Sequence, residues 1–423
     1  VVAGAALVVI GLPTTIVWSV LRLTRLLDDH ARAAVPVVAA LTALWLVCGA
    51  SGLVVAAPYP AASRTSTGKI LDELAAVRDG RLDQQVLAAE LATDRYRDVP
   101  ADRLLTGLRG KRVVLVFVES YGRVAIDDPT VAPPVLATLA DGDRQLAAAG
   151  LQSRTGYLTS STTGGGSWLA HATLLSGLWI DSQRRYLTLT ASDRLTLTQT
   201  FQRGGWRTVG VMPGVTSAWP EGAFFHYDEI HDSADLGYAG PPFTWARVPD
   251  QYTLAQLDRF THRGPGSSPP AMAVVPLVTS HAPWTPVPPM LDPDRLGDGA
   301  GYGPAAGGVE PPEAIGTRER TRVQADYARS ISYSLTSVVS WASEEPDEDL
   351  VLIVLGDHQP APLVTGGSSN RDVPITVITR DPAVLSRIES WDWTPGLRPA
   401  PETPVWRMDA FRDRFLDAFS AGS

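Results

Sequence analysis

Residues 350–360 form the stretch LVLIVLGDHQP. Its first six residues are apolar, as expected for a strand that is buried on both faces of a parallel sheet. The run stops at Gly356, and Asp357 and His358 follow directly. Ligands of open α/β sheets bind beyond the carboxyl ends of the strands, so this pair indicates a metal or substrate site. The alternative is a turn in which Asp357 caps a helix and His358 lies in solvent.

Two more apolar runs end in a similar way. Residues 111–120, KRVVLVFVES, predict a buried strand followed by Glu119, and residues 271–280, AMAVVPLVTS, predict one that leads to His281. An unpaired carboxylate is costly to bury. Glu119 is therefore expected either in a functional site or in solvent at the end of its strand.

A glycine-rich segment precedes a predicted helix at residues 158–180, LTSSTTGGGSWLAHATLLSGLWI. Glycines let the backbone approach a ligand closely, and the free N–H groups of a helix N-terminus favour an anion such as phosphate. Ser167 is expected at this N-terminus, either as a functional hydroxyl or as an ordinary N-cap residue.

Strands alternate with predicted helices, the latter at residues 192–201, 249–260 and 321–345. This alternation predicts an α/β fold with a largely parallel sheet and helices on both faces. The carboxyl ends of parallel strands share one edge of the sheet, so the polar residues that follow them should converge. These residues are Glu119, Ser167, His281, Asp357 and His358.

The converging side chains suit metal-assisted phosphoryl chemistry. Two carboxylates and an imidazole are ligands for Mn²⁺, Mg²⁺ or Zn²⁺. A hydroxyl bound to such an ion has a lowered pKa and becomes a nucleophile near neutral pH. The ion and a helix N-terminus would then stabilise charge on a transferring phosphoryl group.

The N-terminal region predicts a membrane anchor. Residues 1–21 and 33–63 carry no charge, and each run is long enough for a transmembrane helix. Arg22, Arg25 and Arg32 lie between them, which favours a cytoplasmic loop. The chain after residue 63 is therefore expected outside the cytoplasm, in a multi-pass membrane protein.

The rest of the chain divides into three predicted parts. Residues 64–109 indicate a helical connector, residues 110–395 the catalytic domain, and residues 396–423 a tail with one helix at 405–419. The formal net charge of -9 argues against nucleic-acid binding. A single cysteine, Cys48, excludes both a disulfide framework and a thiolate zinc cluster.

Four motifs occur in the order FVESYG, a glycine-rich hydroxyl segment, TSHAPW and LGDH. Together they resemble the lipoteichoic acid synthase branch of the alkaline phosphatase/sulfatase superfamily. The resemblance implies one metal, with Mn²⁺ favoured and Mg²⁺ or Zn²⁺ as alternatives, held by Glu119, Asp357, His358 and the nucleophile oxygen. It further implies covalent transfer of phosphoglycerol from phosphatidylglycerol to an acceptor, with His281 at the substrate phosphate.

Some positions depart from that family's pattern. The family nucleophile is Thr, whereas the matching residue here is Ser167, with Thr162 and Thr163 as nearby alternatives. The family's acidic residue four positions later is replaced by His171, which we expect at the substrate.

Two aromatic residues are further candidates for the substrate pocket. Trp219 resembles a substrate tryptophan of the family, although Glu221 stands where the family has Arg. Tyr327, on the predicted helix at 321–345, is the second candidate. Packing in the core or on the surface is the alternative for both.

We therefore expect a membrane-anchored, metal-dependent phosphoryl-group transferase. Its donor would be a phospholipid and its acceptor an envelope glycolipid or polymer. A phosphodiesterase or phosphatase, with water as acceptor, is one alternative. A non-catalytic envelope scaffold is another, although the presence of Glu119, Asp357 and His358 favours an enzyme.

Overall fold

The computed structural model describes residues 82–243, 247–262, 269–303 and 312–421, with scattered residues before 82. The chain forms two compact units, Val1–Ala88 and Ala89–Ser423. In the first unit, β1 (Val54–Ala56) pairs antiparallel with β2 (Tyr59–Pro60). Most of the two predicted membrane spans, and the connector up to residue 79, lie outside the described residues. Within the described part of the chain, no helix is long and apolar enough to cross a membrane.

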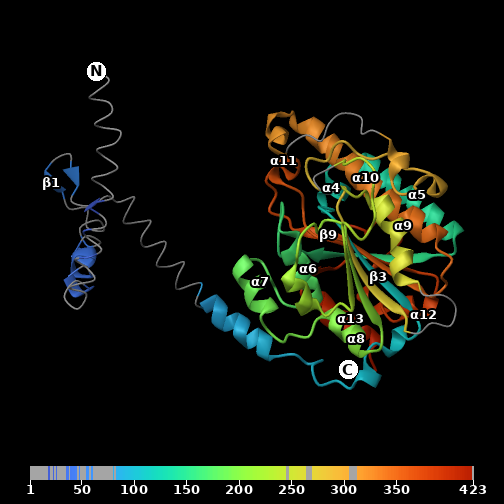
Figure 1. Ribbon diagram of the computed structural model, residues 1–423, viewed down its shortest axis with the longest axis horizontal. Coiled ribbons are helices and arrows are strands. Elements are labelled where there is room, and N and C mark those ends of the chain that lie inside the picture. The colour runs from blue at the N-terminus through green and yellow to red at the C-terminus, as the bar shows by residue number, and fades with distance from the viewer. Residues whose placement is uncertain are drawn as a thin grey trace. The chain divides into compact units, whose positions relative to one another are not determined.

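The second unit is built on one mixed sheet, to which the described residues contribute nine strands (Figure 1). The strand order is β10-β4-β9-β8-β3-β7-β5-β6, and β11 pairs with β4. The bounds are β3 (Arg112–Val118), β4 (Gln152–Thr159), β5 (Arg207–Met212), β6 (Glu229–Asp232), β7 (Ala271–Leu277), β8 (Leu350–Gly356), β9 (Asp372–Thr379), β10 (Thr394–Pro395) and β11 (Val405–Arg407).

The centre of the sheet is parallel, as the apolar runs predict. The five strands β8, β3, β7, β5 and β6 lie in this order, and each is parallel to the next. β9 is antiparallel to both β8 and β4, and β10 is antiparallel to β4, which makes the sheet mixed. Every residue of β3 and β8 is buried, which explains their continuous apolar sequences.

Helices cover both faces of the sheet (Figure 1). On one face α10 packs against α5, α9 and α11, and Val114, Val116 and Val118 of β3 belong to the same core cluster as residues of these helices. On the other face Phe117 of β3 contacts α6, which packs against α7, α8 and α13. The bounds are α4 (Val124–Asp127), α5 (Ala132–Ala148), α6 (Ser167–Ser176), α7 (Gln183–Thr190), α8 (Leu197–Arg203), α9 (Asp250–Thr261), α10 (Arg320–Glu344), α11 (Pro362–Thr365), α12 (Pro382–Ser386) and α13 (Ala410–Phe419).

Two predicted helices begin later than expected. The helix predicted at 192–201 begins at Leu197, after Thr196 caps its first turn by accepting from the N–H of Gln199. The helix predicted at 405–419 begins at Ala410, because Val405–Arg407 instead form β11 beside β4. The tail is therefore part of the sheet-containing unit.

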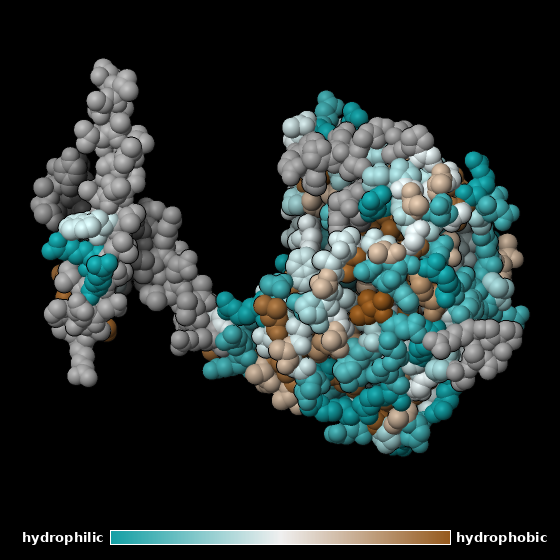
Figure 2. All heavy atoms as spheres, viewed as in Figure 1, coloured by the Kyte–Doolittle hydropathy of each residue, from teal (hydrophilic) through white to brown (hydrophobic). Residues whose placement is uncertain are grey.

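The surface of this unit is mostly hydrophilic in the view of Figure 2, with small hydrophobic areas between polar side chains. Among its described residues, the exposed large hydrophobic side chains are Trp168, Leu187, Ile230 and Val405. These are scattered over several elements, as is normal for a water-exposed surface.

Candidate metal and nucleophile site

The candidate site begins where β3, β7 and β8 end together. Val118 of β3 pairs with Gly356 of β8 on one side and with Leu277 of β7 on the other. Glu119 directly follows the end of β3, and Asp357 directly follows the end of β8. The parallel register alone therefore places two carboxylates side by side at the carboxyl edge of the sheet.

Glu119, Asp357 and His358 form a compact group of possible metal ligands. One ligand atom from each lies within 4.8 Å of the others, and all three residues are buried. Nε2 of His358 is 3.4 Å from Oε1 of Glu119 and 3.7 Å from Oδ2 of Asp357. Two carboxylates and an imidazole are a donor set for a divalent cation.

Hydrogen bonds fix which atoms of this group face a cation. Oδ1 of Asp357 accepts the backbone N–H groups of Ser120 and His358, both at 2.7 Å, while buried Oδ2 has no hydrogen-bond partner. Nδ1 of His358 lies 2.8 Å from the carbonyl oxygen of Gln359 and so carries the proton. The lone pair of His358 is therefore on Nε2, the atom nearest the carboxylates.

Ser167, the first residue of α6, brings a hydroxyl to the ligand group. The three glycines before it, residues 164–166, have φ angles of 70°, 144° and 79°, a backbone that other residues rarely adopt. The Ser167 hydroxyl donates to Oε2 of Glu119 at 2.8 Å and lies 3.2 Å from Nε2 of His358.

The two nearby threonines are placed differently. Thr163 forms an isolated bridge with Gln359, and the N–H of Gly164 donates to the Gln359 carbonyl at 2.7 Å, so the loop is fixed to the end of β8. The Thr162 hydroxyl is buried without a hydrogen-bond partner. Of the three candidate nucleophiles, Ser167 is the one whose hydroxyl is bonded to the ligand group.

Two histidines reach the group from further elements. His281 lies four residues beyond β7, and its Nδ1 is 2.7 Å from the carbonyl oxygen of Ala282. His171 lies one turn beyond Ser167 on α6, and its Nε2 is 3.8 Å from Oδ2 of Asp357. Burial lowers the pKa of His171 to about 4, so its imidazole is neutral at physiological pH.

Burial and neighbouring charges set the protonation of the group. Burial and the Glu119 carboxylate raise the pKa of Asp357 to about 7. Burial also acts to raise the pKa of Glu119, but His358 and His281 hold it below its ordinary value. Burial opposes charge on His358, yet Asp357 and Glu119 raise its pKa above the ordinary value. Without a metal, the group therefore retains protons near neutral pH that a bound cation would displace.

The two aromatic candidates for the pocket are placed differently. Tyr327 is fully buried on α10, and its hydroxyl donates to the carbonyl oxygen of Ser120 at 2.8 Å. It supports the turn after β3, which is the core-packing alternative for this residue. Trp219 lies just before the 3-10 helix η3 (Pro220–Phe225), half-buried, with its ring centroid 5.7 Å from that of Phe225. Its contact with substrate stays a prediction.

Three serines that hold the ligands were not identified from the sequence. The Ser120 hydroxyl donates to Oε1 of Glu119 at 2.8 Å. Ser280 donates to the Glu119 carbonyl and Ser160 to the Asp357 carbonyl, both at 2.6 Å. The only sequence signal was a hydroxyl residue beside a predicted strand end, and such residues are common in turns.

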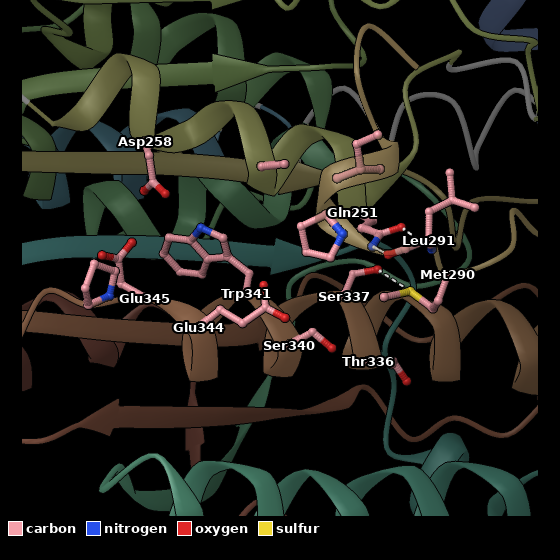
Figure 3. A pocket seen from close by; sticks show the side chains of 14 residues that line it. Gln251, Asp258, Met290, Leu291, Thr336, Ser337, Ser340, Trp341, Glu344 and Glu345 are labelled. Carbon is pink, nitrogen blue, oxygen red and sulfur yellow. Dashed lines mark hydrogen bonds between the residues drawn. The ribbon is translucent and has the colours of Figure 1, made fainter. Parts of the chain in front are cut away.

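A separate cavity of about 440 Å³ lies between α9 and α10 (Figure 3). Its wall includes Asp258 and Glu345. Together with His262, these two residues form a second group of side chains that could bind a metal ion. Arg112 already pairs with both carboxylates, at 3.0 Å from Asp258 and 2.6 Å from Glu345. We assign this group to ion pairing.

No protein-family model and no curated protein matches the chain. Among solved structures, it is similar to the lipoteichoic acid synthase LtaP from Listeria monocytogenes, with 12% identity over 65% of this chain and 67% of that one, and a TM-score of 0.44.

Two further solved structures are similar. The soluble domain of lipooligosaccharide phosphoethanolamine transferase A from Neisseria meningitidis is 15% identical over 76% of this chain and 93% of that one, with a TM-score of 0.46. The Streptococcus pyogenes phosphoglycerol transferase GacH, in complex with sn-glycerol-1-phosphate, is 13% identical over 81% and 92%, with a TM-score of 0.42. At these identities and TM-scores the similarity carries no argument about function, so the chemistry is inferred from the site's own residues.

Proposed function

We propose that this protein is a metal-dependent phosphoryl-group transferase in which Ser167 is the nucleophile. One observation carries the proposal: the Ser167 hydroxyl is 2.8 Å from Oε2 of Glu119 and 3.2 Å from Nε2 of His358. The hydroxyl of Ser167, the first residue of α6, thus contacts the carboxylate of Glu119 and the imidazole of His358, both of which are buried. Nucleophiles activated by a cation need this proximity.

The residues present fit one divalent metal. Glu119, Asp357 and His358 would hold it, together with the oxygen of Ser167. Oδ2 of Asp357 is buried without a hydrogen-bond partner, as expected of an atom that a cation satisfies. When bound, the metal would lower the pKa of the nucleophile hydroxyl and would provide positive charge that stabilises the transferring phosphoryl group. The resemblance favours Mn²⁺, and the same donor set also suits Mg²⁺ or Zn²⁺.

The protein's own groups position the phosphate and move the protons. The N-cap residue of α6 is Gly166, so no capping side chain competes for the first-turn N–H groups, which suit a phosphate oxygen. Because Nδ1 of His281 donates to the Ala282 carbonyl, we assign Nε2 of His281 to the substrate phosphate and leaving oxygen. His171 and Trp219 are kept as candidate substrate contacts.

The transfer is proposed to occur in two displacement steps. In the first, the Ser167 hydroxyl gives its proton to Oε2 of Glu119 and its oxygen bonds to phosphorus, while the bond from phosphorus to the lipid oxygen breaks and His281 gives that oxygen a proton. In the second, an acceptor hydroxyl loses its proton to His281 and bonds to phosphorus, while the bond to Ser167 breaks and the Ser167 oxygen takes its proton back from Glu119. Both steps conserve the number of phosphoester bonds.

The donor and acceptor are proposed from the four-motif resemblance. They are a phospholipid such as phosphatidylglycerol and an envelope glycolipid or polymer. The two uncharged runs near the N-terminus would anchor the protein in the cell membrane, with the catalytic unit outside the cytoplasm. Such an anchor would keep the site close to a lipid donor.

The proposal is tested by incubating the full chain in detergent with phosphatidylglycerol and Mn²⁺, and measuring released diacylglycerol. We expect release by the wild type and none by Ser167→Ala or Glu119→Gln, whereas Thr163→Ala, a neighbouring hydroxyl variant, keeps the activity. Release with free glycerol phosphate as the sole product, even when a glycolipid acceptor is present, would identify a phosphodiesterase instead. Full release by Ser167→Ala would overturn the assignment of the nucleophile.

A further inference from the structure

Trp168 is the residue directly after the proposed nucleophile, and its ring is open to solvent. Both residues belong to the first turn of α6, so their Cα atoms are about 3.8 Å apart. Trp168 is 49% exposed, and it is the one aromatic residue among the exposed large hydrophobic side chains in the described part of the sheet-containing unit. Its indole is therefore within reach of a molecule that reacts at Ser167.

The indole of Trp168 is held by its polar edge. Its Nε1 donates to Oε1 of Gln183, the first residue of α7, at 3.0 Å. A hydrogen bond at the edge of the ring does not cover the apolar ring faces, which are the surfaces that bind a flat ligand. Because Oε1 of Gln183 is the acceptor, the Nε2 group of the same amide is the end that can donate to a ligand beside the ring.

The same short helix also contacts Trp219, the sequence-based candidate for substrate binding. Burial raises the pKa of Tyr186, against a hydrogen bond with Trp219 that acts to lower it. Tyr186 lies three residues after Gln183 on α7, and positions three apart are neighbours on a helix surface. The first two turns of α7, which packs against α6, therefore hold both tryptophans.

The chemistry around Trp168 suits a sugar ring better than an acyl chain. An indole face is apolar and carries negative charge density, and a pyranose presents to it a face of C–H groups with partial positive charge. The hydroxyl groups of a sugar need polar partners, and exposed Gln183 lies at the ring edge, with exposed Arg184 next in sequence. An acyl chain would instead need a continuous apolar groove.

We propose that Trp168 stacks on a pyranose ring of the acceptor and so places a sugar hydroxyl at the phosphorus carried by Ser167. This inference rests on the proposed function, because it names the class of acceptor in the second step as a glycan or glycolipid with a sugar at its reactive end. In that step the sugar hydroxyl loses its proton to His281 and bonds to phosphorus. The bond to Ser167 breaks, and the Ser167 oxygen takes its proton back from Glu119.

The test compares two soluble acceptors that differ in the ring. Methyl β-glucopyranoside contains a pyranose, whereas glucitol is an open-chain polyol of similar size. The full chain, in a detergent without sugar groups, is incubated with Mn²⁺ and phosphatidylglycerol. Transfer of phosphoglycerol is then measured over a range of acceptor concentrations. For the wild type we expect the KM of the glucoside to be about tenfold below that of glucitol.

Variants separate stacking from other effects of an exposed hydrophobic side chain. Trp168→Ala should raise the KM of the glucoside about tenfold and that of glucitol less, because it removes the ring face. Trp168→Phe keeps an aromatic face and should recover most of the affinity for the glucoside. Leu187→Ala is the matched control, since Leu187 is 51% exposed on α7 without an aromatic face, and it should leave both KM values unchanged.

Equal KM values for the two acceptors in the wild type, or an unchanged glucoside KM in a folded Trp168→Ala protein, would overturn the inference. Circular dichroism checks the fold. A membrane contact would overturn it in another way: Trp168→Ala and Leu187→Ala would both slow diacylglycerol release from phosphatidylglycerol vesicles, and neither would change the glucoside KM.

The same assay distinguishes this inference from the proposed function. Diacylglycerol release by the wild type without transfer to the glucoside would overturn the sugar acceptor and leave the assignment of Ser167 intact. A wild type that releases no diacylglycerol would overturn the proposed function, and the acceptor assignment with it.

Discussion

The backbone N–H of Ser120 donates a 2.7 Å hydrogen bond to Oδ1 of Asp357, which joins the turn after β3 to the end of β8. The hydroxyl of Ser120 donates to Oε1 of Glu119 at 2.8 Å. One residue therefore orients both carboxylates of the candidate metal centre. Ser120 does so with a φ of 57°, a left-handed conformation that is unfavourable for any residue but glycine. The Tyr327 hydroxyl bonds its carbonyl oxygen and helps to hold it there.

We predict that Ser120→Ala binds the divalent metal ~10–100-fold more weakly, because groups that orient metal ligands contribute to affinity on this scale. Ser120→Gly removes the same hydroxyl but tolerates the left-handed backbone. It should show the same loss of affinity, with a higher unfolding temperature than the alanine variant in the absence of metal. Metal titration and thermal unfolding of the two variants check this.

Ser280→Ala is the control for the Ser120 variants. The Ser280 hydroxyl is buried in the same site but donates to the backbone carbonyl of Glu119 instead of its carboxylate. Its removal should change metal affinity less than Ser120→Ala. Equal losses in the two variants would contradict a specific role for the contact between Ser120 and the carboxylate.

Gly356, the last residue of β8, is expected to be intolerant of any side chain. A Cβ at this position would lie 1.9 Å from the carbonyl oxygen of Tyr121. Gly356→Ala should therefore push the β3 turn away from β8, destabilise the fold by about 1–3 kcal/mol or more, and weaken metal binding.

Gly316→Ala is the matched control for Gly356→Ala, since no atom lies within 4 Å of its Cβ position. Thermal unfolding and metal titration should leave this variant close to the wild type. A Gly356→Ala protein with wild-type stability and affinity would show that the turn after β3 is not held closely against β8.

Asp357 is predicted to make the metal-free protein less stable as the pH rises. Burial and Glu119 raise the pKa of Asp357 from 3.8 to about 7, so the folded chain holds a proton that the unfolded chain has released. Between these two values the folded state binds more protons, and its stability falls with increasing pH. Asp357→Asn should remove this contribution.

The pH prediction is checked by thermal unfolding in a chelator between pH 5 and 8. The wild type should lose stability relative to Asp357→Asn as the pH approaches 7. Adding metal should reverse the trend in the wild type, because the cation binds the ionised carboxylate. Parallel pH profiles of the two metal-free proteins would contradict the raised pKa.

The central strands and their polar ends could be predicted from sequence because β3, β7 and β8 are buried on both faces. Such strands give continuous apolar runs, and a polar residue directly after one is conspicuous. Because parallel strands share one carboxyl edge, Glu119 and Asp357 could be placed at the same edge of the sheet before their contacts were known.

The sequence did not predict the elements whose hydrophobic patterns are weaker, among them β4 and α5. β4 reads QSRTGYLT and alternates between exposed and buried residues in its first half, so it has no apolar run. α5 contains two prolines and Gly142, which suggest a broken helix. The prolines lie in the first turn, where they are tolerated, and a Cβ on Gly142 would approach Val339 of α10 to 3.0 Å.

The supporting contacts of the site could not be predicted because they join residues far apart in sequence. Tyr327 and Ser120 are separated by 207 positions, and Ser160 and Asp357 by 197. A tyrosine on the buried face of a helix gives no sign of which carbonyl its hydroxyl will meet. The same limit applies to His171, whose neighbour Asp357 is known only from the fold.

The most direct test of a covalent mechanism is the intact mass of the full chain after incubation with phosphatidylglycerol and metal, beside Ser167→Ala treated identically. We predict that the wild type gains the mass of one phosphoglycerol group and that Ser167→Ala gains none while still folding. A gain that persists in Ser167→Ala, or no gain in a wild type that binds metal and releases diacylglycerol, would contradict the covalent role of Ser167.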